Sequence, residues 1–351
     1  MKIREFRVGV GAAMLMSLLA MPVVGAEFAD PLDQMASSSP LAANNLLNGL
    51  GRAGERIVAV GQRGHILVSG DAGKSWVQAK VPVTSDLVAV NFVSAKKGWA
   101  VGHGGVVLAT NDGGESWNRQ LDGRAAGRQM AEHYARSDAA LAAEAQRFAE
   151  QGPDKPFLDV WFENENTGYV VGAFNLIFRT DDSGRSWQPW FDRTDNPNLF
   201  NLYAIRKIGD DIYIVGEQGL LMKLDRQAGR FSAIETPYKG SYFGVTGKRG
   251  ALIVYGLRGN VYRSTDNGAN WTKVETGLQQ AIATSAITDD GRILLATPGG
   301  LVLASADDGA SFKRLPLEHA MPAFAILAQG RDAVVVAGQR GVRVLPVKQQ
   351  N

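Results

Sequence analysis

The octapeptide TDDSGRSW at residues 180–187 contains a spacing of Ser/Thr, Asp, Gly and Trp that recurs along the chain. Related octapeptides are SGDAGKSW at 69–76, TNDGGESW at 110–117, STDNGANW at 264–271 and SADDGASF at 305–312, with a degenerate copy, LDRQAGRF, at 224–231. The steps between their final aromatic residues are 41, 70, 44, 40 and 41 positions. A period near 41 residues indicates a repeat architecture, and four-stranded propeller blades have this length.

A second repeated element lies before the octapeptides and indicates the number of blades. Its copies are GQRG at 61, GHGG at 102, GAFN at 172, GEQG at 216, GLRG at 256, TPGG at 297 and GQRG at 338. The fourth position is Gly six times and Asn175 once, which indicates a positive φ in a turn between the second and third strands of each repeat. We therefore predict an all-β fold, a seven-bladed β-propeller of four-stranded antiparallel blades.

The step of 70 residues between Trp117 and Trp187 is too long for one repeat and predicts an insertion between blades 2 and 3. The extra segment, about 123–152, is rich in Ala and free of Pro, as a helix prefers. We expect a single helix or a helical hairpin packed on the propeller, with a partner-binding arm as the equally weighted alternative. The residues at helical spacing are Met130, Tyr134, Leu141, Ala145 and Phe148.

The seventh repeat ends early, because only five residues follow GVRVLP at 341–346. These are too few for a good fourth strand and its turn. The N-terminal segment 27–45 is predicted to supply that strand and so to remove an open sheet edge. Its residues Pro31 and Pro40 are tolerated if the strand lies at an edge. The propeller itself is then expected over residues 46–351.

The first 26 residues are typical of a signal peptide. Lys2, Arg4 and Arg7 precede the uncharged stretch 8–26, which ends in small residues suited to cleavage. An uncleaved membrane anchor is the alternative, because an uncharged stretch of this length is barely long enough to span a bilayer. With cleavage, we expect an exported protein with no direct membrane span. Its compartment would be the periplasm, or the thylakoid lumen if the host is photosynthetic.

Composition excludes several kinds of chemistry. The chain contains no Cys, which excludes disulfides, thiolate metal sites and a lipid attached to an N-terminal Cys. When the three basic and one acidic residue of 1–26 are removed from the totals of 37 and 35, 34 of each remain. The remaining chain therefore lacks the basic footprint of a nucleic-acid-binding protein. We expect no metal and no cofactor, because the four His residues show no metal-ligand spacing: His65, His103, His133 and His319.

The repeated octapeptide is the Asp box, or BNR repeat, and its repetition indicates a structural role. The Asp residues are expected to accept hydrogen bonds from turn amides, and the aromatic residues are expected to fill gaps between blades. A catalytic site is needed once, so these positions are predicted to be structural. They are Asp71, Trp76, Asp112, Trp117, Asp182, Trp187, Asp266, Trp271, Asp307 and Phe312.

Asp boxes occur in sialidases, in other glycosidases and in binding propellers. Over about residues 45–346 the chain more closely resembles the photosystem II stability/assembly factor family. The resemblance rests on seven short blades, the G-x-x-G turns, and phrases such as GWAVG at 98–102 with ATNDGGESW at 109–117. It implies a non-catalytic exported scaffold that assists the assembly of a membrane protein complex. That complex is photosystem II in photosynthetic hosts. In non-photosynthetic bacteria, similar exported proteins are often encoded beside genes for exporters of the resistance–nodulation–division (RND) class.

The alternative function is a sialidase-like glycoside hydrolase or a glycan-binding propeller. A hydrolase needs an Arg cluster with a Tyr–Glu pair, or two facing carboxylates. The sialidase RIP signature is missing, and we predict no catalytic residues. The available Glu residues show no obvious Tyr partner: Glu163, Glu165, Glu217 and Glu235. A deep pocket with clustered carboxylates would favour a hydrolase, whereas a broad rim of Arg and aromatic residues would favour a scaffold.

The turns between the second and third strands are expected on the same propeller face as the connections between blades, including the helical insertion. This face would surround the channel mouth with cationic, polar and aromatic side chains. We predict that it binds a protein partner, a membrane protein or membrane complex. The residues proposed for contact are Arg63, His103, Phe174, Gln218, Arg258 and Arg340, with Glu217 beside them.

Overall fold

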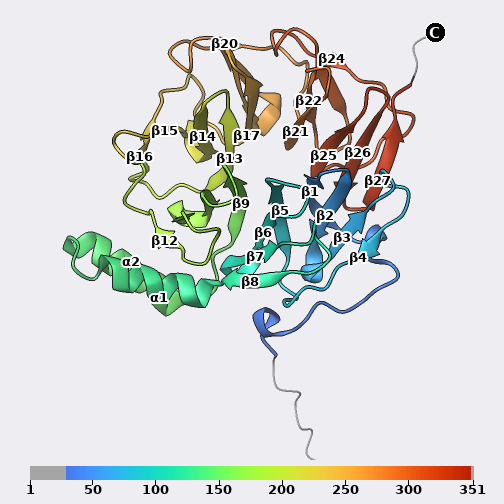
Figure 1. Ribbon diagram of the computed structural model, residues 1–351. Helices are drawn as coiled ribbons and strands as arrows, with labels where there is room; N and C mark the ends of the chain where they lie inside the picture. The colour runs from blue at the N-terminus through green and yellow to red at the C-terminus, as the bar shows by residue number, and fades with distance from the viewer. Residues whose placement is uncertain (1–28, 349–351) are drawn as a thin grey trace, which may run out of the picture.

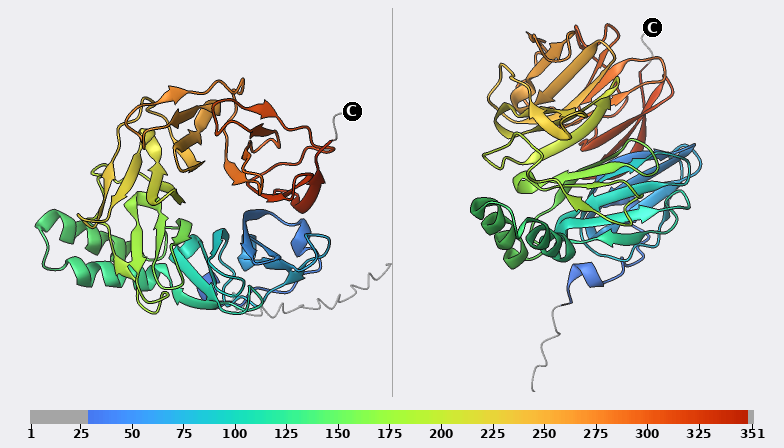
Figure 2. Two further views of the ribbon diagram at one scale, coloured as in Figure 1. Left: turned by 45° about the horizontal axis from the view of Figure 1, so that its top comes forward. Right: turned by 60° about the vertical axis from the view of Figure 1, so that its left-hand side comes forward.

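The structure is a computed structural model that describes residues 29–348. These residues form seven small antiparallel sheets arranged in a ring, which Figures 1 and 2 show from three directions. Within each sheet the strands pair in sequence order, and the first strand lines the central channel. The predicted seven-bladed propeller is therefore confirmed. The predicted signal peptide, 1–26, lies outside the described residues.

The first four blades each have four strands. Blade 1 comprises β1 (Leu47–Ala53), β2 (Arg56–Gly61), β3 (Ile66–Ser69) and β4 (Val77–Gln78). Blade 2 comprises β5 (Leu87–Phe92), β6 (Gly98–Gly102), β7 (Val106–Thr110) and β8 (Asn118–Leu121). Blade 3 comprises β9 (Phe157–Phe162), β10 (Gly168–Gly172), β11 (Ile177–Thr180) and β12 (Gln188–Pro189). Blade 4 comprises β13 (Leu202–Ile208), β14 (Asp211–Gly216), β15 (Leu221–Asp225) and β16 (Arg230–Ala233).

The remaining blades complete the ring. Blade 5 comprises β17 (Tyr242–Lys248), β18 (Ala251–Gly256), β19 (Val261–Ser264) and β20 (Thr272–Lys273). Blade 6 comprises β21 (Thr284–Ile287), β22 (Ile293–Ala296), β23 (Val302–Ser305) and β24 (Lys313–Arg314). Blade 7 comprises β25 (Ala325–Gln329), β26 (Ala333–Gly338) and β27 (Gly341–Pro346). Second strands such as β6 are buried along their whole length, which explains their continuous apolar sequences.

The core consists of apolar layers between neighbouring blades. The Asp-box aromatic residue of a blade lies in the layer shared with the preceding blade. Trp117 of blade 2 packs with Val58 of blade 1, and Trp187 of blade 3 packs with Trp99 of blade 2. Trp76, Trp271 and Phe312 are placed in the same way. Large aromatic rings thus hold adjacent sheets together around the ring.

Two helices form the insertion between β8 and β9, α1 (Gly123–Tyr134) and α2 (Ala139–Gln151) (Figure 1). Asp122 and Asp138 cap them by accepting hydrogen bonds from first-turn N–H groups. The predicted helical insertion is confirmed, and it is a hairpin. Its apolar residues enter the layer between blades 2 and 3: Met130, Tyr134, Ala145 and Phe148, with Leu141 packed against them. Neither helix, nor any other in residues 29–348, is long and apolar enough to cross a membrane.

Blade 7 has three strands in the described residues, and the prediction of a fourth strand from the N-terminal segment is wrong for residues 29–45. That stretch contains two 3-10 turns, η1 (Pro31–Asp33) and η2 (Ala42–Asn44), and no strand. The N–H groups of Ala42 and Asn44 donate within the turn, to Ser39 O and Leu41 O. Because these groups are used locally, they are not available to extend a sheet.

The segment 29–46, here called the arm, follows the ring from α1 to β27. Arg124 of α1 donates to both carboxylate oxygens of Asp33, each at 2.9 Å. Gln78 of blade 1 accepts from the Ser39 N–H and donates to Ser37 O, also at 2.9 Å. Beyond these contacts, η2 packs against β27. The arm therefore connects the insertion with blades 1 and 7.

Candidate partner-binding face

Seven turns between second and third strands define one end of the ring, here called the turn face. Five contain 3-10 turns, which are η3 (Gln62–Gly64), η4 (His103–Gly105), η5 (Ala173–Asn175), η6 (Glu217–Gly219) and η7 (Leu257–Gly259). The other two are at 297–300 and 338–341. The fourth position has a positive φ in all seven, as its Gly and Asn residues predicted: Gly64, Gly105, Asn175, Gly219, Gly259, Gly300 and Gly341.

Four of these turns also place a non-glycine residue in the left-handed region, one position earlier. The φ angles are 55° at Arg63, 53° at Phe174, 53° at Gln218 and 58° at Arg258. A residue with a side chain is destabilised there by about 1–2 kcal/mol, and blade 2 has Gly104 at the equivalent position. All four side chains are exposed. Strained backbone of this kind clusters at functional sites.

Hydrogen bonds from the next blade hold two of the four strained turns. The Arg63 N–H donates to Asp86 Oδ1 at 2.7 Å, and the Phe174 N–H donates to Asn201 Oδ1 at 2.8 Å. Asp86 and Asn201 each precede the inner strand of the next blade. Glu217 accepts from the Asn201 N–H at 2.9 Å. These bonds fix the orientation of the turns relative to the channel mouth.

The six residues predicted to contact a partner all lie on the turn face and are exposed: Arg63, His103, Phe174, Gln218, Arg258 and Arg340. Arg340 differs because it lies in the two-residue turn between β26 and β27. Glu217 is half-buried and already hydrogen-bonded. Phe174 is 53% exposed and Leu257 is 38% exposed, so the face offers apolar as well as cationic groups. Leu257 was not predicted, because a lone Leu in a turn carries no distinctive sequence signal.

Lys155 connects the insertion to the turn face. Its side chain is buried, and Nζ lies 4.6 Å from the ring centroid of Phe148 and 6.0 Å from that of Phe174. Nζ also donates to Asp154 Oδ1 at 2.7 Å. A desolvated ammonium between aromatic rings is attracted to both. Lys155 therefore lies between the exposed ring of Phe174 and the base of the helical hairpin.

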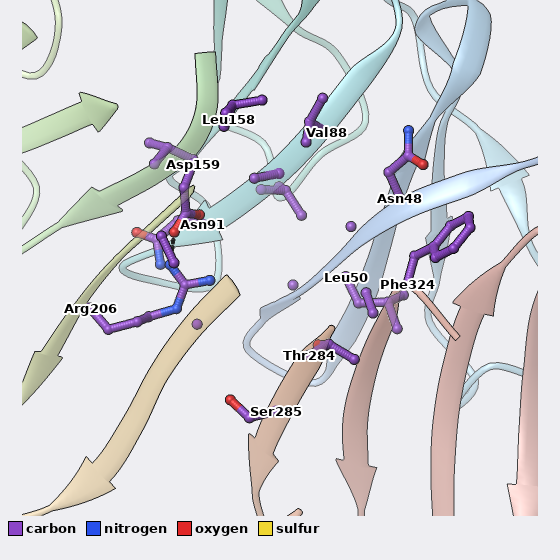
Figure 3. Close-up of a pocket in the computed structure, with 18 of the residues that line it drawn as sticks. Asn48, Leu50, Val88, Asn91, Leu158, Asp159, Arg206, Thr284, Ser285 and Phe324 are labelled. Carbon is purple, nitrogen blue, oxygen red and sulfur yellow. Dashed lines mark hydrogen bonds and ion pairs between the residues drawn. The ribbon is translucent and has the colours of Figure 1, made fainter. Parts of the chain in front are cut away.

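A channel with a volume of about 490 Å³ runs along the inner strands of all seven blades. At its turn-face end five inner strands carry an extra residue in the register, and such bulges re-aim a side chain. These residues are Asn48, Val88, Leu158, Tyr203 and Phe243. With Phe324 they form a half-buried, largely apolar set here called the collar, part of which is labelled in Figure 3. The collar was not predicted from the sequence, because a one-residue bulge leaves the strand pattern almost unchanged.

Asp159 of β9 and Arg206 of β13 form an ion pair in the channel wall (Figure 3). Asp159 is buried and also accepts from the Ile205 N–H at 2.8 Å. Burial raises the pKa of Asp159, whereas Arg206 acts in the opposite direction. Among the described residues that line the channel, Asp159 is the one carboxylate. The two facing carboxylates of a glycoside hydrolase are not found in that lining.

The four Glu residues considered for a hydrolase do not line the channel in the described structure. Glu163 and Glu165 lie between β9 and β10, at the end opposite the turn face, and Glu163 pairs with Arg226 at 2.8 Å. Glu217 lies in η6, and Glu235 follows β16. Within residues 29–348 there is also no group of three or more His, Asp or Glu placed to hold a metal ion.

The Asp boxes lie at the end opposite the turn face and are satisfied internally. Asp71 accepts from Ser69 Oγ at 2.8 Å, from the Ser75 N–H at 2.9 Å and from Ser75 Oγ at 2.6 Å. Equivalent bonds reach the carboxylates of Asp112, Asp182, Asp266 and Asp307. The bonds from Asn270 lower the pKa of Asp266 to about 2. These carboxylates therefore serve the turns in which they lie.

The family model described as photosynthesis system II assembly factor YCF48 matches residues 68–133 and 142–295, more than half of the chain. The chain belongs to the YCF48 family. The matched region contains η4 to η7, with His103, Phe174, Gln218 and Arg258. Arg63 and Arg340 lie outside it.

A YCF48 relative from Synechococcus sp. (strain CC9902), described as a photosystem II assembly lipoprotein, is 31% identical over 130 residues. That match covers 36% of this chain and 38% of the relative. The chain thus matches well under half of the relative's length.

Solved structures of YCF48 proteins share the fold. One is described as YCF48 bound to D1 peptide, with a TM-score of 0.62 and 16% identity over 94% of this chain and 100% of the other. The YCF48 of Cyanidioschyzon merolae gives a TM-score of 0.61 and 16% identity, over 91% and 99% of the two chains. The WD40 propeller domain of Doa1 gives 0.62 at 10% identity, over 92% and 97%. At these identities the likeness shows the fold alone.

Proposed function

We propose that this YCF48-family protein is a non-catalytic binding protein that assists the assembly of a membrane protein complex. It would hold a segment of one subunit of that complex against the turn face. The observation that carries the proposal is the pairing, at one channel mouth, of the apolar collar with exposed Arg side chains on strained turns. Membership of an assembly-factor family supports the same role.

The chemistry of this face suits a peptide segment with one apolar and one acidic group. In the collar, Tyr203 and Phe243 meet edge to face with ring centroids 5.5 Å apart and remain half-buried. An apolar side chain inserted between such rings loses water contact. Arg63 and Arg258 at the rim offer guanidinium groups that bind carboxylates in a bidentate manner. The channel volume, about 490 Å³, fits a few side chains rather than a folded domain.

The proposed compartment is the exported side of a membrane. Residues 1–26 have the pattern of a signal peptide, which is the basis for placing the protein in the periplasm or the thylakoid lumen. A related structure is described as bound to D1 peptide, which supports recognition of a peptide by a propeller of this family. In a non-photosynthetic host we propose an exporter of the RND class as the client.

A pull-down from detergent-solubilised host membranes tests the proposal. The variants are Phe174→Ala and the triple variant Arg63→Ala, Arg258→Ala, Arg340→Ala. The matched control is Lys313→Ala with Arg314→Ala, which removes exposed cations from the fourth strand of blade 6. All proteins are first shown to unfold cooperatively.

We expect the two turn-face variants to recover about tenfold less partner, because central Arg and aromatic residues dominate interfaces. The control should recover as much as the wild type. Equal recovery by every folded protein would overturn the proposal. Turnover of a sialoside or another glycoside by the purified chain would support the hydrolase alternative instead.

A further inference from the structure

Within residues 29–348, the outer edge of β27 lacks the strand partner that the third strand of each other blade has. β26 and β27 are joined by a two-residue turn, so Gly338 and Gly341 form the hydrogen-bonded pair nearest the turn. The backbone groups of Val342 and Val344 therefore point away from β26. In the described residues no strand pairs with them.

The other blades show how a fourth strand is hydrogen-bonded to the third. In five blades the first C=O of the third strand accepts from the N–H that follows the fourth strand. These bonds, at 2.8 to 3.0 Å, run from Ala79 to Ile66, Trp190 to Ile177, Ile234 to Leu221, Val274 to Val261 and Leu315 to Val302. The equivalent oxygen in blade 7 is Val342 O, which instead accepts from the guanidinium of Arg343 at 2.7 Å. Arg343 thus occupies the hydrogen-bonding position of the absent strand.

A groove of about 430 Å³ lies at this edge. It is lined by residues 342–344 of β27, by Ala43 and Asn44 of η2, and by residues 73–76 of the blade 1 Asp box. Between blades 1 and 2 the chain after the fourth strand contacts the next Asp box, where Lys80 N–H donates to Glu115 O and Trp117 N–H donates to Lys80 O, both at 3.0 Å. The groove therefore has the two surfaces that hold an outer strand elsewhere in the ring, which are the edge of a third strand and the Asp box of the next blade.

The open stretch is similar in length to the other outer strands. Glu318 N–H donates to Pro346 O at 3.1 Å and so covers the far end of β27. The uncovered part is the stretch from Val342 to Val344. Of the other six outer strands, β4, β12, β20 and β24 are two residues long, and β8 and β16 are four residues long. A two-residue ladder with an Asp-box contact is thus the usual outer strand of this propeller.

We propose that an extended segment of a partner protein, carrying an acidic side chain, adds to β27 in this groove as the fourth strand of blade 7. Main-chain hydrogen bonds supply the affinity in such strand addition. Lys74 and Arg343 line the groove, and none of its described lining residues is acidic. Charge complementarity therefore selects an acidic segment.

Two other occupants fit the groove less well. A second copy of this chain, paired through the same edge, would bring Lys74 and Arg343 against their own counterparts. The arm is already committed elsewhere, since residues 29–46 follow blades 2 and 1 and end in η2 at the groove wall. This surface is separate from the turn face proposed above, so both can bind at the same time.

Binding requires an exchange at Arg343. The incoming N–H replaces the guanidinium on Val342 O, and the guanidinium then turns to the acidic side chain of the segment. In the free protein Arg343 also donates to Asn44 Oδ1 at 2.6 Å. Arg343 therefore covers the edge until a segment of suitable charge arrives, as charged side chains do on other exposed edges.

A peptide copied from blade 4 provides the probe, residues 231–237 (FSAIETP). In blade 4 Ser232 lies opposite Lys223 and the Ile234 N–H faces the third strand. The Ala233 N–H points outward, to Asp195 Oδ2 at 3.2 Å. N-methylation at the Ile234 position therefore removes an inward donor, and N-methylation at the Ala233 position is the matched control. Labelled peptides are titrated with the full chain up to millimolar concentration, and fluorescence anisotropy is recorded.

We expect saturable binding of the unmodified peptide, weakened about tenfold or more by methylation at Ile234 and about twofold or less by methylation at Ala233. Val344→Pro should abolish binding and leave the pairing of β27 with β26 intact, because the N–H that it removes points outward. A peptide with Lys in place of Glu235 should bind more weakly, most clearly at low salt. The triple Arg variant of the turn face should bind like the wild type.

Three results would overturn the inference. One is the absence of saturable binding by the unmodified peptide. Another is that the two methylated peptides bind equally well, both to the wild type and to Val344→Pro. The third is concentration-dependent dimerisation that Val344→Pro abolishes, which would assign the edge to a second copy of the chain.

Discussion

The indole ring of Trp187 stands edge-on to the ring of Phe162, with centroids 6.0 Å apart and planes at 90°. Phe162 in turn lies flat against Trp99, at 3.4 Å and 6°. The three rings link the Asp box of blade 3 to the second strand of blade 2, in the layer that the helical hairpin also enters. Trp187, an Asp-box residue at the end of the propeller opposite the turn face, therefore packs in the same core layer as the helical insertion.

Trp187→Ala should lower the free energy of unfolding by about 3–5 kcal/mol, because it removes a large buried ring that the neighbours cannot replace. Urea unfolding followed by circular dichroism measures the change. Val77→Ala is the control, since Val77 is 71% exposed, and should change stability by less than about 0.5 kcal/mol. Equal stability of the two variants would contradict a structural role for Trp187.

Trp117→Phe should cost more stability than Trp187→Phe. Both rings are 4% exposed, but Trp117 Nε1 donates to Gly114 O at 3.0 Å, whereas Trp187 Nε1 has no partner among the described residues. The difference expected is about 0.5–1.5 kcal/mol, the net contribution of one hydrogen bond. The comparison uses the same urea unfolding measurement, and the reverse order would refute the assignment of this bond.

Asp266→Asn should reduce the loss of stability in acid. The pKa of Asp266 is lowered from 3.8 to about 2 by the bonds from Asn270, so its contribution to stability is present above about pH 4 and is lost as the pH falls toward 2. The variant lacks this titration, so its unfolding temperature should change less between pH 5 and pH 2. Asp289→Asn, at an exposed position, serves as the control and should follow the wild type.

Arg206→Met should destabilise the propeller, and more so at neutral than at acid pH. Removing one partner of a buried ion pair costs about 3–5 kcal/mol, and the half-exposed side chain of Arg206 favours the lower end. Without Arg206 the backbone N–H bonds to Asp159 remain, but burial is the largest influence and raises the folded-state pKa of Asp159 further above 3.8. When the folded-state pKa of a carboxyl group is raised, the protein loses stability as the pH rises above about 4.

Thermal unfolding at pH 4.5 and pH 7 measures this effect. The double variant Asp159→Asn, Arg206→Met should show a smaller difference between the two pH values. If Arg206→Met loses the same stability at both pH values, the pKa of Asp159 does not depend on Arg206.

Gln218→Gly should stabilise the protein by about 0.5–1 kcal/mol, because glycine relieves the left-handed strain at φ 53°. If the strained turns serve binding, the same variant should recover less partner from membranes. Ala72→Gly is the matched control, with a φ of 61° in the blade 1 Asp box. It should gain similar stability and recover as much partner as the wild type.

The repeat made most of the fold predictable. The G-x-x-G turns gave the blade count because Gly64 and its equivalents occupy a backbone conformation that few other residues adopt. The insertion was predictable because it interrupts a regular period. Within the described residues, the fourth strand of blade 7 was predicted wrongly, because the arm forms 3-10 turns in which N–H groups such as those of Ala42 and Asn44 are used locally.

The candidate site was less predictable for a physical reason. The Gly residues of the G-x-x-G motifs indicated where the turns lie, so the exposed residues inside the motifs, such as Arg63 and Phe174, could be named. The collar depends on bulges at residues such as Leu158 and Tyr203, which shift one residue without altering the apolar pattern. The contact of Lys155 with Phe174 joins an irregular segment to a turn. No local periodicity in the sequence indicates such a contact.

Asn44 and Arg343 are hydrogen-bonded although 299 positions separate them. Contacts of such long range form late, because the loop-closure entropy must be overcome before they contribute. We therefore expect the junction of blades 7 and 1 to assemble last, after the whole chain is available. Blades 1 to 6 have complete outer strands. The junction of blades 7 and 1 relies instead on the apolar layer that contains Leu47 and Val335, on the arm and on Arg343. A chain truncated before residue 341 would leave the ring open at this point.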